Sequence, residues 1–140
     1  IYTSDWAFYF FEKAFPNAVG FYGEDNRVDS ARVGREGTIN ANVLDANMQA
    51  VLGSNMADLY YDLGSWALAE TVDDGNSEVL IRGNAPYDDW VSWSFGTVPN
   101  SPLAIRYDFG SGTAIYTSFH NERQATVDMT RLLEEIILSL

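Results

Sequence analysis

The only histidine of this chain, His120, lies two residues before a carboxylate, Glu122, in the stretch IYTSFHNERQ. An imidazole exchanges a proton near neutral pH, and a nearby carboxylate can orient it, so this pair supplies half of a nucleophilic catalytic triad. A lone histidine at the end of a strand can equally be a polar side chain that caps a turn. The two residues by themselves therefore leave a catalytic and a structural role open.

The segments on either side of His120 indicate how it is positioned. Residues 113–119 (TAIYTSF) are rich in β-branched and aromatic side chains and predict a buried strand. Asn121, followed three residues later by Gln124, has the form of a helix N-cap with its reciprocal partner, and apolar residues then recur at helical spacing. His120 is therefore predicted at a strand-to-helix junction, where α/β proteins place ligand sites.

The F-H-x-E pattern follows the glycines at 110 and 112, precedes the last helix, and resembles the closing motif of class I glutamine amidotransferase-like domains. The opening S-D-W-A and the closing S-F-H-N-E are similar to uncharacterised domains of this flavodoxin-like superfamily in large secreted bacterial proteins. The resemblance implies a triad in which His120 and Glu122 act with a nucleophile at an earlier strand-to-helix turn. That turn falls at Ser4, or at Asp5 if it comes one residue later.

Two features depart from the superfamily pattern. The chain has no cysteine, so thiol-dependent glutamine hydrolysis is excluded. The glycines around an amidotransferase nucleophile are also missing, since Ser4 lies in the sequence T-S-D-W, and serine is a favoured helix N-cap. We therefore predict a non-catalytic structural or ligand-binding module of a larger secreted bacterial protein, with a degenerate amidotransferase-like site. The alternative is a serine hydrolase that uses Ser4, His120 and Glu122.

Composition narrows the class of partner. A chain of 140 residues with 46% apolar content is long enough for one globular domain with a sizeable core. The net charge of −12 argues against nucleic acid and anionic membrane surfaces, and suits cationic ligands or calcium. No apolar stretch reaches the roughly 18 residues of a spanning helix, so no membrane insertion is expected. The resemblance implies a secreted or cell-surface location.

Clustered acidic and amide side chains raise the question of calcium. Asp73, Asp74 and Asn76 crowd into one turn, and a second group lies between residues 24 and 29. Their oxygen atoms suit a hard cation, but neither segment has EF-hand spacing and such residues are common in turns. The alternatives for the first turn are a Ca²⁺ site and ordinary turn chemistry, and no other cofactor is expected.

The segment from Tyr87 to Phe95 combines aromatic side chains with two aspartates. Such a group can form a platform for a ligand. It can also be a loop that its tryptophan residues hold against the core, and both alternatives stay open.

Hydrophobic periodicity predicts an α/β domain. We expect residues 23–37 to form a loop and residues 84–93 to be irregular. The predicted elements are a strand end at 1–3, a helix at 5–15, strands at 38–44, 59–63, 67–71 and 79–82, a short helix between Asp45 and Gly53, a hairpin of 103–108 with 113–119, and a helix at 124–140. With the resemblance, these elements predict a flavodoxin-like, mostly parallel sheet with an antiparallel C-terminal hairpin, and the first and last helices packed together.

A flavodoxin-like domain normally starts with two strands and a helix before the nucleophile strand, and the sequence shows no such elements. We therefore expect residues 1–140 to be a single domain that is the later portion of an interrupted one. The expected partner is the missing N-terminal segment or a second copy of the chain. Either would cover the aromatic side chains of residues 1–15 and pair the first strand.

Overall fold

Strands, not helices, make up most of the regular structure. The computed structural model of the chain describes residues 1–23, 30–72, 75–120 and 126–140. Of these residues, 50% lie in strands and 23% in helices, and eight strands form one curled, mixed sheet. The prediction of a flavodoxin-like, mostly parallel sheet is therefore wrong.

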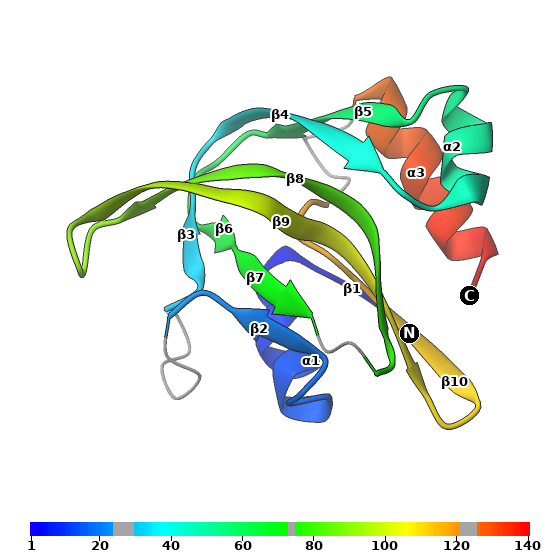
Figure 1. Cartoon of the computed structure of the whole chain (residues 1–140), viewed down its shortest axis with the longest axis horizontal. Coiled ribbons are helices and arrows are strands. Elements are labelled where there is room, and N and C mark those ends of the chain that lie inside the picture. Colours follow the sequence, from blue (N-terminus) through cyan, green and yellow to red (C-terminus); the bar gives the residue numbers. More distant parts are fainter. Residues whose placement is uncertain (24–29, 73–74, 121–125) are drawn as a thin grey trace.

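Figure 1 shows the elements in chain order. They are β1 (Tyr2–Ser4), the short 3-10 helix η1 (Asp5–Ala7), α1 (Phe8–Ala14), β2 (Val19–Phe21), β3 (Arg32–Gly34), β4 (Gly37–Val43), α2 (Ala46–Leu52), β5 (Met56–Tyr61), β6 (Trp66–Ala67), β7 (Ala69–Val72), β8 (Ser77–Asp89), β9 (Ser94–Phe109), β10 (Gly112–Thr117) and α3 (Val127–Leu138). None of the described helices is long and apolar enough to cross a membrane.

The main sheet has the order β1-β10-β9-β8-β3-β6, with β4 paired to β8 and β5 to β4. Among the described strands, only β1 and β10 pair in parallel. A parallel pair needs a long crossover, usually helical, whereas tight turns join β8 to β9 and β9 to β10. The short connections therefore account for the antiparallel pairing of β8, β9 and β10. Strands β2 and β7 form a separate two-stranded sheet.

The hairpin of β8 and β9 extends through two segments, 84–89 and 94–102, that were not predicted as strands. Residues 84–89 belong to β8 and pair with the first part of β9, so the prediction that 84–93 is irregular is wrong for most of that range. Pro86 lies within β8, and its carbonyl oxygen accepts a hydrogen bond from the backbone N–H of Arg35, at 3.0 Å. That residue follows β3, which also interrupts the loop predicted at 23–37.

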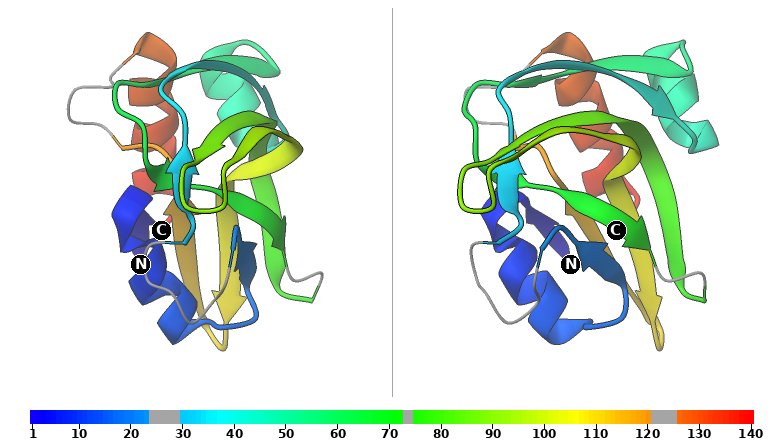
Figure 2. Two further views of the ribbon diagram at one scale, coloured as in Figure 1. Left: turned by 90° about the vertical axis from the view of Figure 1, so that its left-hand side faces the viewer. Right: turned by 60° about the vertical axis from the view of Figure 1, so that its left-hand side comes forward.

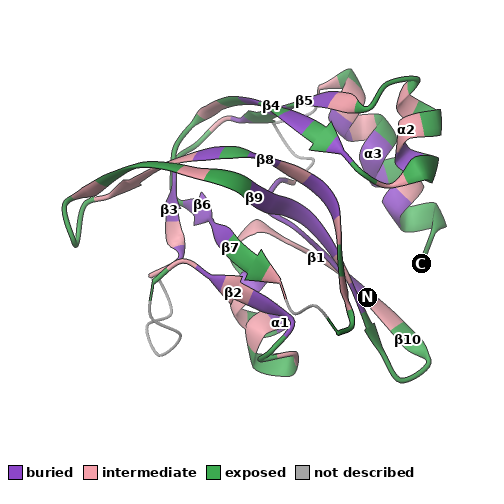
Figure 3. Cartoon of the chain, viewed as in Figure 1, coloured by how far each residue is buried: buried purple, intermediate pink, exposed green. Residues whose placement is uncertain are grey.

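Two hydrophobic clusters lie on different parts of the curled sheet. The larger includes buried side chains of α2 and α3, and in it the rings of Tyr61 and Trp66 stack with centroids 4.4 Å apart. The smaller joins Phe8 and Phe11 of α1 to β2, β7 and the end of β9. Since α1 and α3 belong to different clusters, the predicted packing of the first and last helices together is wrong. Figure 2 shows their separation, and Figure 3 shows the buried residues along the middle of the sheet.

Other parts of the chain bury much of the apolar surface of residues 1–15. Strand β1 pairs with β10, with Tyr2 opposite Ile115, and Phe8 and Phe11 are buried. Trp6 and Phe10 remain exposed. An external partner for these two side chains, whether an N-terminal segment or a second copy, stays a prediction.

Candidate functional site

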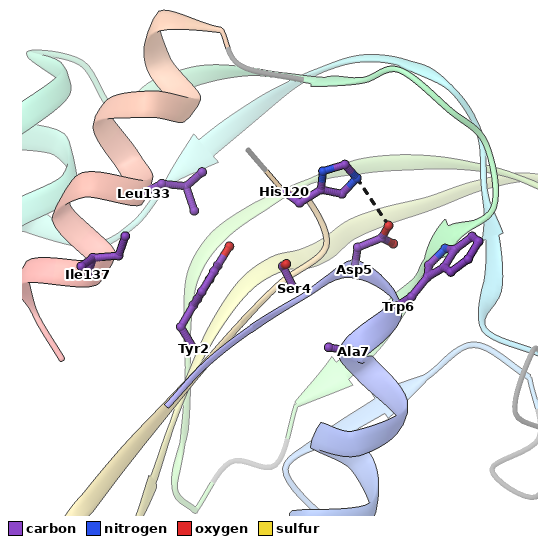
Figure 4. Close-up of a pocket in the computed structure, with 8 residues that line it drawn as sticks. All are labelled: Tyr2, Ser4, Asp5, Trp6, Ala7, His120, Leu133 and Ile137. Atoms are coloured by element: carbon purple, nitrogen blue, oxygen red, sulfur yellow. Dashed lines mark ion pairs between the residues drawn. The ribbon is translucent and has the colours of Figure 1, made fainter. Parts of the chain in front are cut away.

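The parallel pairing of β1 with β10 brings two chemically active side chains together. Both strands end at the same edge of the sheet, β1 at Ser4 and β10 at Thr117, and the residues that follow each strand therefore meet there. Asp5 directly follows β1, and His120 comes after the buried Phe119. Nε2 of His120 lies 3.6 Å from Oδ2 of Asp5, as Figure 4 shows. The strand-end position predicted for His120 is confirmed.

The turn after β1 has a strained backbone at Asp5. Its φ is 44°, in the left-handed region that costs energy for a side chain other than glycine. A strained residue between a strand and a helix presents its side chain at the top of the sheet, as in the nucleophile elbow of hydrolases. Of the two positions that the sequence offered for this turn, Ser4 and Asp5, the strained one is Asp5.

Ser4 lies at the N-cap position of η1, with φ −142° and ψ 154°, but its side chain makes no capping hydrogen bond. The hydroxyl instead interacts with the phenol of Tyr2, which also lies 3.0 Å from Oγ1 of Thr117. Burial raises the pKa of Tyr2, and hydrogen bonds from these two hydroxyls oppose the rise. Helix capping therefore does not explain why a serine stands at this position.

At the end of β1 and β10, the ionisable side chains that lie together are those of Asp5 and His120. In a serine triad, Nε2 of the histidine faces the serine hydroxyl, whereas here it faces a carboxylate. Glu122, the third member of the predicted triad, lies outside the described residues. The Ser4–His120–Glu122 triad therefore stays a prediction.

Burial raises the pKa of the Asp5 carboxyl group. It raises the pKa of Asp5 from its ordinary value of 3.8 to about 6, although the nearby charges of His120 and Arg32 and a backbone hydrogen bond from Ala67 each lower it. The side chain of Asp5 is 17% exposed, so a cleft molecule can reach it. A carboxyl group that titrates near neutral pH in a cleft is a common feature of functional sites.

A cleft of about 550 Å³ opens beside the pair. Figure 4 shows hydroxyl, carboxylate and imidazole groups along its floor and two apolar side chains of α3 on one wall. Its lining comprises Tyr2, Ser4, Asp5, Trp6, Ala7, His120, Leu133 and Ile137. The volume is that of a site for a small organic molecule.

Trp6 forms the rim of the cleft and is held from two sides. Its indole Nε1 donates a hydrogen bond to the carbonyl oxygen of Ser65 at 3.1 Å, and the guanidinium carbon of Arg32 lies 3.5 Å from its ring centroid. The exposed ring is therefore fixed in place before any ligand arrives.

Sequence reasoning named Asp5 and His120 but missed the cleft around them. That Leu133 and Ile137 form one wall could have been predicted, because residues four apart share one face of a helix. The contribution of Tyr2 and Trp6 could not, since it depends on β1 pairing with β10 and on the chain near Ser65 approaching η1.

The proposed calcium turn is only partly described. Asp73 and Asp74 lie outside the described residues, and the backbone carbonyl of Asn76 accepts a hydrogen bond from the N–H of Asp108 at 3.0 Å. Within the described ranges, no three His, Cys, Asp or Glu side chains gather in a metal-binding arrangement. Calcium at this turn stays a prediction.

Comparison with protein-family models, with characterised proteins and with solved structures found no match for this chain. The fold and the cleft define it as a mostly β protein with a carboxylate–imidazole pair at the end of its parallel strand pair.

Proposed function

We propose that this chain is a non-catalytic ligand-binding module that holds a small organic cation in the Asp5–His120 cleft. The observation that carries the proposal is a largely buried carboxylate, with a pKa raised to about 6, that faces a cleft of about 550 Å³. Above that pH Asp5 is mostly ionised. A ligand ammonium group would then offset the cost of a partly buried negative charge.

The walls of the cleft indicate the rest of the ligand. Leu133 and Ile137 suit a short apolar chain, and the ring of Trp6 adds apolar surface at the rim. The net charge of −12 favours approach of cations and disfavours that of anions. An alkylammonium head with a short hydrocarbon tail combines these features.

Isothermal titration of the chain with three matched probes tests the proposal: n-hexylammonium, 1-hexanol and hexanoate. We expect n-hexylammonium to bind best, hexanoate not to bind, and the affinity for the ammonium to increase as the pH rises through about 6. D5N should remove the preference for the ammonium over the alcohol. E70Q, which neutralises an exposed carboxylate on β7, is the matched control. Equal binding of ammonium and carboxylate probes, or an unchanged preference in D5N, would refute the cation site.

The second candidate is the serine hydrolase, and it is favoured by the place of Ser4 at the end of β1, directly before the strand-to-helix turn and in the lining of the cleft that His120 also lines. In that reaction Ser4 attacks, His120 acts as general base and Glu122 orients the imidazole. Treatment with a fluorophosphonate probe followed by peptide mass spectrometry distinguishes the candidates. A label on Ser4 that disappears in H120A would establish the hydrolase, whereas an unlabelled Ser4 agrees with the non-catalytic module.

The proposal also places the module in a larger secreted or cell-surface bacterial protein. Support comes from the opening S-D-W-A and closing S-F-H-N-E motifs, whose Asp5 and His120 the fold brings within 3.6 Å of each other. This support does not depend on a flavodoxin-like sheet, which the chain lacks. A calcium ion at Asp73, Asp74 and Asn76 would raise the melting temperature in Ca²⁺ above that in chelator, and equal melting would remove calcium from the proposal.

A further inference from the structure

A second cavity lies where the β8–β9 hairpin crosses β3 and the chain before β6. Its volume is about 440 Å³, and we call it the hairpin groove. The residues that matter for its chemistry are Arg35, Glu36, Ser65, Asp88 and Trp90. Ser65 also accepts the hydrogen bond from Trp6, so the hairpin groove adjoins the rim of the Asp5–His120 cleft.

An exposed aromatic cluster continues from the hairpin groove to the tip of the hairpin. Trp90, Trp93 and Phe95 contact one another edge to face, with ring centroids 4.8–6.4 Å apart. The two tryptophans are 65% and 72% exposed. Figure 1 shows the tip projecting beyond the rest of the molecule, and Figure 3 shows it exposed. Because exposed aromatic clusters of this kind usually mark interaction sites, the tip is a candidate binding surface.

The aromatic tip is held in one conformation by its own polar contacts. The side chain of Asp89 accepts hydrogen bonds from the backbone N–H groups of Val91 and Ser92, at 2.9 and 3.1 Å. The hydroxyls of Tyr87 and Ser94 lie 3.1 Å apart across the two strands. A platform that is already ordered loses little conformational freedom on binding.

Beside the ring of Trp90, the hairpin groove offers paired donors and acceptors. Nη1 of Arg35 lies 3.8 Å from Oδ1 of Asp88, and both side chains remain partly exposed. The backbone N–H of Arg35 donates a hydrogen bond to the carbonyl oxygen of Pro86, so the start of this side chain is fixed beside the hairpin. A guanidinium and a carboxylate side by side can bind two neighbouring hydroxyl groups, one as donor and the other as acceptor.

We propose that the hairpin groove and the aromatic tip bind a neutral oligosaccharide. A pyranose ring has an apolar face of C–H groups, which stacks on an indole, and a rim of neighbouring hydroxyls, which matches the arginine–aspartate pair. The net charge of −12 disfavours nucleic acid and acidic polysaccharides. The carboxylates of Asp88 and Asp89 beside the aromatic rings disfavour insertion of the tip into a bilayer.

Native gel electrophoresis through gels that contain one neutral polysaccharide each tests this inference. The probes are a mixed-linkage β-glucan, xylan, galactomannan and soluble starch, with pectate as the acidic comparison. We expect at least one neutral polymer to retard the chain and pectate not to. Intrinsic tryptophan fluorescence with the matching hexasaccharide then gives the affinity.

The variants W90A and R35Q should each weaken that binding, W90A on the order of tenfold or more. F10A is the matched control, since Phe10 of α1 is 72% exposed, as Trp93 is, and lies outside the hairpin. The inference fails if no neutral polymer retards the chain, or if W90A binds as the unaltered chain does. It also fails if the tip binds phosphatidylcholine vesicles while no polysaccharide is bound. Asp5 is intact in all these variants, so failure here leaves the cation site unaffected.

Discussion

Replacing Asp5 by asparagine should make the folded chain more stable at neutral pH, although the substitution removes half of an ion pair. The side chain keeps its size and its place in the turn after β1, and only the charge is lost. Burial raises the pKa of Asp5 from 3.8 to about 6, which means that the folded chain holds this proton more tightly than the unfolded chain does. The ionised carboxylate therefore disfavours folding, whereas asparagine resembles the protonated group.

The size and the pH range follow from the same two values. A rise from 3.8 to about 6 corresponds to about 3 kcal/mol, at about 1.4 kcal/mol for each tenfold change in proton affinity. This contribution to stability is fully present below pH 3.8 and is lost as the pH rises through about 6. D5N should therefore equal the unaltered chain near pH 4 and exceed it by up to about 3 kcal/mol at pH 7.5, or on the order of 10 °C in melting temperature.

Urea unfolding followed by circular dichroism at several pH values between 4 and 8 measures the difference. Taking the difference between the two proteins cancels the titration of the other acidic groups, and E70Q provides a second baseline. E70Q should show no pH-dependent gain of this size because its carboxylate is exposed on β7. If D5N were less stable than the unaltered chain at pH 7.5, attraction to His120 would outweigh the cost of burial, and the reasoning would be refuted.

Three further substitutions, with G112A as a comparison, test local contacts of the fold. G34A should destabilise by about 1–3 kcal/mol, because a Cβ there would lie 2.1 Å from the Trp66 ring, whereas G112A, with its nearest neighbour at 3.6 Å, should cost far less in urea unfolding. D45A should cost about 1 kcal/mol in the same measurement, because its carboxylate accepts the 2.9 Å bond that caps α2. Y61F should cost about 1 kcal/mol in thermal melting, because the buried hydroxyl of Ser118, 2.7 Å away, loses one of its two hydrogen-bond partners. A neutral Y61F would mean that this hydroxyl pair contributes nothing.

Helices and turns whose determining residues lie within a few positions of one another could be predicted from the sequence. Asp45 caps α2, and Gly53 ends it with a φ of 71°, as expected from their side chains alone. The hairpin across residues 109–112 is present because its strand patterns and its glycines are adjacent in the chain. The last helix is also confirmed. Its N-cap is Thr126, and nothing in the local sequence beyond its residue type marks it as the cap. Asn121, the expected cap, lies outside the described residues.

The fold class could not be predicted, because strand patterns do not specify their partners. Residues 84–89 look irregular by composition, yet β9 supplies a ladder of hydrogen bonds for them. The apolar stripe of α3 likewise indicates one face but not how much of it is covered. Met129 and Leu132 are buried, whereas Ile137 on the same stripe is exposed at the cleft.

The candidate site divides in the same way. Residue types and motif spacing identified His120 and the turn at Ser4 and Asp5, because an imidazole and a strand-to-helix turn can be read locally. Tertiary structure decided which of the two faces the imidazole, since strands 112 residues apart must first pair. It also decided the acidity of Asp5, because the burial that raises its pKa comes from packing that no local pattern specifies.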